Sequence, residues 1–149
     1  MEVQIENRQG KHRISKKKIQ QKARAILNAL DYPDAELSIL IVDDQQITRL
    51  NQQYLNREGP TNVIAFAMQE GPFVEIAPDL LGDVVISAES AHREAKSADL
   101  STAVYFDQLL IHGILHLLGY DHENDKSEAH KMEQKADEIF DFIKSQPAP

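Results

Sequence analysis

The spacing of apolar residues along the chain predicts four short strands. Val3 and Ile5 alternate with polar neighbours, a pattern typical of a strand with one face in water. Segment 36–42 is rich in Leu, Ile and Val, which favours a buried central strand. Two more apolar runs of strand length occupy 63–68 and 82–87.

Apolar residues at helical spacing predict helices between these strands and after them. Polar residues that favour helix N-termini precede several of these runs. The expected helices begin, in chain order, at Ser15, at Asp43 or Asp44, at Ser87, at Asp99 or Ser101, and after the polar stretch 123–125. The first is expected to end near Asp31 and the third near Ser97.

Segment 69–80, with one glycine and two prolines, is expected to form a loop or small hairpin that borders the functional site. The tail 146–149 is expected to be loose. No internal repeat or linker interrupts the pattern. The sequence therefore predicts a single α+β domain over residues 1–149, in which several helices cover a mixed sheet of about four strands.

Composition narrows the class of protein. The chain of 149 residues is long enough for one core, and it contains no cysteine, which excludes disulfides and thiolate metal ligands. The N-terminus lacks the basic and apolar regions of a signal peptide, and no apolar run approaches the ~20 residues needed to cross a bilayer. These features predict a soluble, cytoplasmic protein with no membrane partner.

Charge is distributed unevenly along the chain. The formal net charge is -8, yet residues 1–30 hold eight of the sixteen Lys and Arg and only two acidic residues. This basic segment could hold a phosphate backbone on one face of an otherwise acidic protein. Equally, Lys16, Lys17 and Lys18 could be the solvated first turn of a helix. The sequence leaves both interpretations open.

The strongest chemical signal is a run of three histidines. His112 and His116 stand four positions apart, so on a helix their imidazoles lie one above the other on the same face. Gly119 is suited to the left-handed conformation that ends a helix, which lets the chain bring His122 back toward them. Three neutral imidazoles form a zinc site with a fourth position left for water. We therefore predict one Zn²⁺ per chain, although other divalent metals that bind imidazole suit the same ligands.

Residue 113 distinguishes this motif from that of metalloproteases with the same histidine spacing. In the metzincin pattern, a Glu directly after the first His is the general base for peptide hydrolysis. Here the position is Gly113, which cannot accept a proton. The neighbouring residues are mostly apolar. The motif thus predicts a hydrolytic metal site on a buried helix and its following turn, and it disfavours proteolysis.

The histidine motif at 112–122 resembles the signature of the YbeY family, bacterial endoribonucleases called rRNA maturation factors. Two other stretches match in the expected order, Asn56-Arg57 followed by 60–66, and 81–87. Length and order agree over nearly the whole chain. The family commonly has Asp and Ser where this chain has Asn62 and Ala65.

The resemblance implies a metal-dependent endoribonuclease that is specific for single-stranded RNA and acts in rRNA maturation and quality control of the small ribosomal subunit. It also implies that Arg57 is the functional, catalytic arginine, whose guanidinium can pair with phosphate oxygens in bidentate fashion. The implied partners are single-stranded RNA, rRNA and the small ribosomal subunit.

Two other functions are compatible with the residues alone. One is a metal-dependent hydrolase of peptide or amide bonds that finds its base elsewhere, for instance at Glu58 or at a nearby aspartate. The other is a non-catalytic ribosome-assembly factor in which the metal is structural and the basic N-terminus binds RNA. Turnover of peptide rather than RNA would favour the first, and unfolding on metal removal would favour the second.

Several further polar residues are candidates for the site. Asp121 could orient a histidine or could cap a turn. Asp83, at the start of a strand, could point at solvent or at the site. His12, His92 and His130 have no partner at metal-ligand spacing. No Gly-rich phosphate loop is present, so no nucleotide cofactor is expected.

Overall fold

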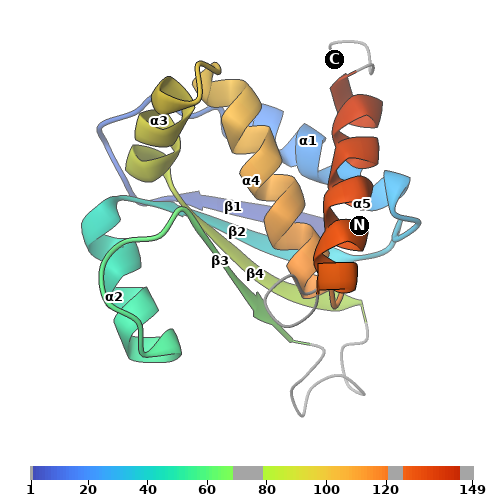
Figure 1. Cartoon of the computed structure of the whole chain (residues 1–149), viewed down its shortest axis with the longest axis horizontal. Coiled ribbons are helices and arrows are strands. Elements are labelled where there is room, and N and C mark those ends of the chain that lie inside the picture. The colour runs from blue at the N-terminus through green and yellow to red at the C-terminus, as the bar shows by residue number, and fades with distance from the viewer. Residues whose placement is uncertain (1, 69–78, 121–125, 145–149) are drawn as a thin grey trace.

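The computed structural model describes residues 2–68, 79–120 and 126–144, and these contain four strands and five helices (Figure 1). The strands are β1 (Glu2–Asn7), β2 (Glu36–Val42), β3 (Val63–Ala67) and β4 (Leu80–Ser87). The helices are α1 (Lys16–Ala29), α2 (Asp44–Leu55), α3 (Ala88–Ser97), α4 (Thr102–Leu117) and α5 (Lys126–Lys144). Every strand and helix that the apolar pattern predicts is present, within one or two residues of its expected bounds.

The four strands form one mixed sheet in the order β1-β2-β4-β3. β1 and β4 both run parallel to β2, whereas β3 pairs antiparallel with β4. The parallel pairs require crossover connections, which α1 supplies between β1 and β2. The predicted α+β class with a mixed four-stranded sheet is confirmed.

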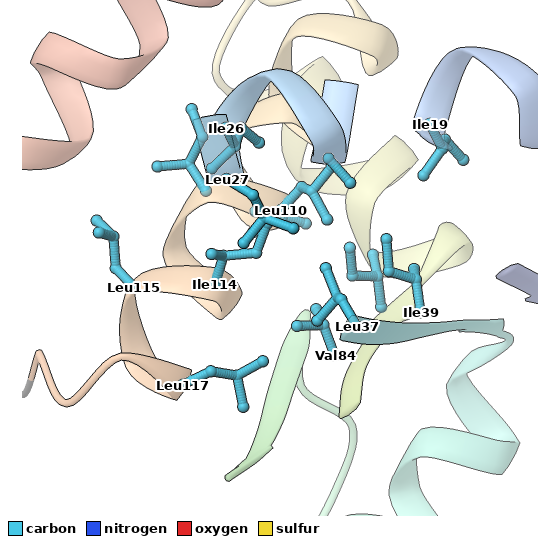
Figure 2. Packing of buried hydrophobic residues seen from close by; sticks show 14 of the residues in the cluster. Ile19, Ile26, Leu27, Leu37, Ile39, Val84, Leu110, Ile114, Leu115 and Leu117 are labelled. Atoms are coloured by element: carbon cyan, nitrogen blue, oxygen red, sulfur yellow. The ribbon is translucent and has the colours of Figure 1, made fainter. Parts of the chain in front are cut away.

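Helices cover both faces of this sheet. α1, α4 and α5 lie on one face and α2 lies on the other (Figure 1). Leu37 and Ile39 of β2 and Val84 of β4 pack with α1 and α4 in the main core, which Figure 2 shows from close by. Val85, the next residue along β4, faces the smaller cluster around Ile47 of α2. Val84 and Val85 face opposite sides of the sheet because successive side chains of a strand point in opposite directions.

Helix α4 lies deep in the molecule. Half of its residues are buried, which matches the predicted buried helix. A Cβ atom on Gly113 would lie only 2.6 Å from Cγ1 of Val84 and 3.3 Å from Cγ2 of Val63. Carbon atoms in contact are about 3.5–4.0 Å apart, so no side chain fits at this point. The glycine therefore lets α4 pack closely on β3 and β4.

A bulge explains why β4 begins before the predicted residue 82. Glu36 of β2 pairs with Leu80, but Leu37 pairs with Gly82, so Leu81 is an extra residue in β4. Gly82 has a φ of 136°, and a Cβ there would collide with the carbonyl oxygen of Phe66. The bulge thus requires glycine at this position.

Side-chain hydrogen bonds show which of the two predicted residues caps the start of α2 and of α4. Asp43 accepts the backbone N–H three positions on at 2.8 Å, and Ser101 does the same at 3.1 Å. Asp43 and Ser101 are therefore the N-caps of α2 and α4, and the cap predicted at Ser15 is also confirmed. The predictions for 69–78 and for the tail 146–149 lie outside the described residues. No helix within the described ranges is long and apolar enough to cross a membrane.

Candidate active site

A cleft of about 940 Å³ opens between α4, α5, the edge strand β3 and the loop that follows α2. His112 and His116 line it from α4, and Arg57 lines it from the loop. Ala65 of β3 lies on the same lining, and Phe140 belongs to the α5 wall. The stretch 57–65, helix α4 and helix α5, which are far apart in the sequence, therefore meet at one concave surface.

The two histidines of α4 have the arrangement that their spacing predicts. Both are half-buried, both line the cleft, and their ring centroids are 6.4 Å apart with an interplanar angle of 52°. Two imidazoles on adjacent turns that open on the same cleft are a suitable part of a zinc or nickel ligand set. His122, the third predicted ligand, lies outside the described residues, as does Asp121. Within the described parts of the chain, no group of three metal-binding side chains comes together.

The end of α4 has the form that the sequence predicts. Gly119 adopts a φ of 97° and donates its N–H to the carbonyl of His116 at 3.0 Å. Tyr120 donates its N–H to the carbonyl of Leu115 at 3.1 Å. These two bonds form a Schellman motif, which satisfies the last carbonyls of the helix and reverses the chain. The backbone thus turns directly after the second histidine.

Packing against the sheet also prevents position 113 from carrying a general base. The Cβ of any residue at Gly113 would be directed into Val84 of the sheet. A longer acidic side chain would have to displace the strand before it reached the cleft. The base of the metzincin mechanism is therefore excluded at this position by packing as well as by residue type.

Arg57 follows a tightly turned helix end. Asn56 closes α2 in the left-handed conformation, with a φ of 54°, and its N–H donates to the carbonyl of Gln52 at 3.2 Å. Arg57 is exposed and lines the cleft, which places a permanent cation in the same cleft as the two imidazoles. Glu58, the alternative base, is exposed and is not among the residues that line the cleft.

The comparisons with known proteins identify the family. Residues 4–144 match the family described as Endoribonuclease YbeY. The chain belongs to the YbeY endoribonuclease family. It is 51% identical over 147 residues to the Endoribonuclease YbeY of Syntrophotalea carbinolica, and 48% identical over 146 residues to that of Geobacter sulfurreducens. In both pairs 97% of each chain is covered.

A solved structure shows the same fold. The solution structure of TM1509 from Thermotoga maritima superposes with a TM-score of 0.61 at 25% sequence identity. The match covers 97% of this chain and 93% of that one. The resemblance drawn from the sequence is thus confirmed at the level of family and fold.

The three stretches that resemble the YbeY family have distinct places in the structure. The described part of the histidine motif, residues 112–120, contributes to the α4 wall of the cleft, and Arg57 lies in the loop on another wall. The stretch 81–87 lies in β4, which contains the bulge at Leu81 and Gly82 and the Val84 side chain against which Gly113 packs. Asp83 of this stretch is exposed and pairs with Phe66 on the α2 side of the sheet, so it points away from the cleft.

One polar network at the cleft has no counterpart among the predictions. The Tyr105 hydroxyl donates to Oε1 of Glu94 at 2.6 Å, and Nδ2 of Asn62 donates to the same oxygen at 2.9 Å. Burial, and then the hydrogen bond to Glu94, raise the pKa of the Tyr105 hydroxyl. An Asp at position 62 would set its carboxylate against that of Glu94. The amide of Asn62 donates instead.

Two other pairs of polar side chains come together without any signal in the sequence. Glu133 and Asp137, four residues apart on α5, both line the cleft. His12 and His92 have ring centroids 4.7 Å apart, although 80 positions separate them. His130 is exposed, as expected. Lys16, Lys17 and Lys18 are exposed in the first turn of α1 and are not among the residues that line the cleft.

Proposed function

We propose that this chain is a metal-dependent endoribonuclease that cuts single-stranded RNA in rRNA maturation and in quality control of the small ribosomal subunit. Family membership gives the endoribonuclease class. The observation that supports the proposed site is the presence of two imidazoles and one guanidinium on the same cleft. This combination suits phosphodiester cleavage, because the imidazoles can hold a metal ion and the guanidinium can face the phosphate oxygens.

His112, His116 and His122 are the proposed ligands of one zinc ion. The side chains present suit zinc, because two half-buried imidazoles on adjacent helical turns open on the cleft. The chain also turns immediately after this helix. When bound, such a metal supplies Lewis-acid chemistry at a phosphodiester. The apolar packing of α4 around Leu115 and Ile114 fixes the helical turns from which the imidazoles extend.

Arg57 is the proposed catalytic residue. Its guanidinium stays charged at every relevant pH and presents parallel N–H donors that match two phosphate oxygens. As a phosphodiester is cut, negative charge grows on the non-bridging oxygens. A cation held in place beforehand stabilises that charge more than it stabilises the substrate, so it accelerates the reaction.

The cleft also has features that suit an unpaired strand. Tyr105 and Tyr120 line it, and unpaired bases stack on aromatic side chains. A duplex keeps its bases stacked on each other and offers no base face to these rings. This supports the proposed preference for single-stranded RNA.

The test is cleavage of a single-stranded RNA by metal-loaded protein, measured side by side for wild type, His116→Ala and Arg57→Ala. Arg49→Ala is the matched control, because Arg49 is an exposed arginine of α2 that does not line the cleft. Metal content and folding are measured for each variant.

We expect His116→Ala to lose metal and activity, and Arg57→Ala to keep metal but to cut about 100-fold to 1,000-fold more slowly, the effect of removing one transition-state donor. Arg49→Ala should cut like wild type. Equal cleavage by all four proteins would show that the activity is a contaminant. Binding of RNA without cleavage by the wild type would favour the assembly-factor function instead.

A further inference from the structure

The loop that carries Arg57 turns sharply at both ends. Asn56 has a φ of 54° and Gly59 a φ of 80°, both in the left-handed region. Pro60 follows, and its ring fixes its own φ. The backbone position of Arg57 therefore depends on the contacts that hold these two turns.

Asn51 contacts the loop at two points. Its backbone carbonyl accepts the N–H of Arg57 at 3.2 Å, and its side-chain Nδ2 donates to the carbonyl of Gly59 at 3.1 Å. A carbonyl only accepts, so the amide nitrogen of Asn51 must face Gly59. One residue of α2 therefore holds the chain both at Arg57 and two residues beyond it.

The burial of Asn51 makes these contacts unusual. Its exposed fraction is 4%, and in the described parts of the chain only Ser87 and Ser90 are comparably buried polar residues. Asn is also a poor helix former, because its amide competes for backbone hydrogen bonds. A buried amide inside a helix costs stability unless it is hydrogen-bonded, and here its donor goes to the Arg57 loop.

The chain beyond the loop is held independently. The N–H of Ser87 in β4 donates to the carbonyl of Asn62 at 3.0 Å, which ties the start of β3 to the sheet. The segment between Asn51 and Asn62 is thus anchored to α2 at one end and to β4 at the other. The loop has little freedom to move Arg57 while the Asn51 contact to Gly59 persists.

We propose that Asn51 is a positioning residue for Arg57: its buried amide fixes the 56–59 turn so that the guanidinium is presented to the cleft. This inference rests on the proposed function of Arg57 as the residue that stabilises phosphate charge. Asn51 does not touch the RNA. Its effect on cleavage passes through Arg57 alone.

The closing experiment is a double-mutant cycle on RNA cleavage. Asn51→Asp keeps the shape of the side chain but replaces the donor by an acceptor that faces the Gly59 carbonyl, and Asn51→Leu removes the donor without adding charge. Each is made in wild type and in Arg57→Ala. Gln53→Glu is the control, since it makes the same amide-to-carboxylate change on the same helix at an exposed position.

In the wild-type background we expect both Asn51 variants to lower kcat by about 10-fold to 100-fold, the scale of misplacing a catalytic group by about 1 Å, with KM little changed. In the Arg57→Ala background they should lower it by less than about twofold, because the group they misplace is already absent. Gln53→Glu should cut like wild type. Full activity of both Asn51 variants, or an equal loss in the two backgrounds, would overturn the inference.

A second readout does not depend on catalysis. The backbone amide of Arg57 should exchange its hydrogen about tenfold faster in folded Asn51→Leu than in wild type, and its side-chain Nε–H signal should shift. Unchanged exchange and an unshifted signal would overturn the role of Asn51 whatever Arg57 does. A shift combined with wild-type cleavage by Arg57→Ala would instead contradict the proposed function while leaving the positioning contact intact.

Discussion

The two walls of the cleft that carry the proposed site residues are built in different ways. The α4 wall is held by packing: Gly113 lies against Val84, and Leu110, Ile114 and Leu115 are buried. The loop wall, residues 56–59, is exposed at Arg57 and is held by two hydrogen bonds with Asn51, one donated by its side chain and one accepted by its backbone carbonyl. Changes in the α4 wall should therefore cost stability first, whereas changes in the loop wall should cost activity at nearly constant stability.

The largest effect on stability is expected for Gly113→Ala. The new methyl would lie 2.6 Å from Cγ1 of Val84, a side chain that is branched at Cβ and cannot swing away easily. Overpacking of this kind costs about 1–3 kcal/mol of unfolding free energy. Urea denaturation of wild type and variant measures it.

A compensating variant provides the control for this clash. Val84→Ala removes the methyl groups that the new Cβ would meet, so Gly113→Ala should cost less in a Val84→Ala background than in the wild type. Equal costs in the two backgrounds would show that α4 and β4 are not in the close contact that the cleft requires.

A smaller effect is expected for Gly119→Ala, at the end of the same helix. Among the described residues no heavy atom lies within 4 Å of a Cβ at this position, so the expected cost is that of holding an L-residue at a φ of 97°. That cost is about 1–2 kcal/mol. Gly119→Asn should lose less, because Asn tolerates left-handed backbone better than Ala does. A thermal unfolding series of the two variants tests this order, and equal losses would point to a cause other than backbone strain.

The residues of the α4 wall could be predicted from local spacing in the sequence, whereas Arg57 of the loop wall could not. His112, His116 and Gly119 lie within one helix and its end, so spacing and residue type were sufficient to place them. The strands and helices followed for the same reason, since each is a local pattern. Arg57 was recognised only through the family resemblance, because an arginine in a loop carries no geometric signature of its own.

Contacts between segments that are far apart in the sequence cannot be predicted from a local pattern of residues. The Glu94 bond to Asn62 joins residues 32 positions apart, and the rings of His12 and His92 meet across 80 positions. Asn51 lies close to its loop in sequence, but nothing in its type or spacing shows that its amide is buried and faces Gly59. The close approach at Gly113 likewise appears only when α4 is placed on the sheet. Residue type alone shows that Gly113 cannot act as a base, and the structure adds that the position is closed by packing.

The smallest effect on stability is expected for Arg57→Ala. Among variants of the loop wall, this one should lose the most activity. Arg57 is exposed, and the turns beside it are closed by backbone and Asn51 hydrogen bonds that the substitution leaves in place. Exposed substitutions away from caps and cores change the unfolding free energy by about 0.5 kcal/mol or less. Urea denaturation of Arg57→Ala beside Arg49→Ala measures the difference. A loss above about 1 kcal/mol at Arg57 alone would mean that the guanidinium also supports the fold. Its effect on cleavage could then no longer be separated from its effect on the loop.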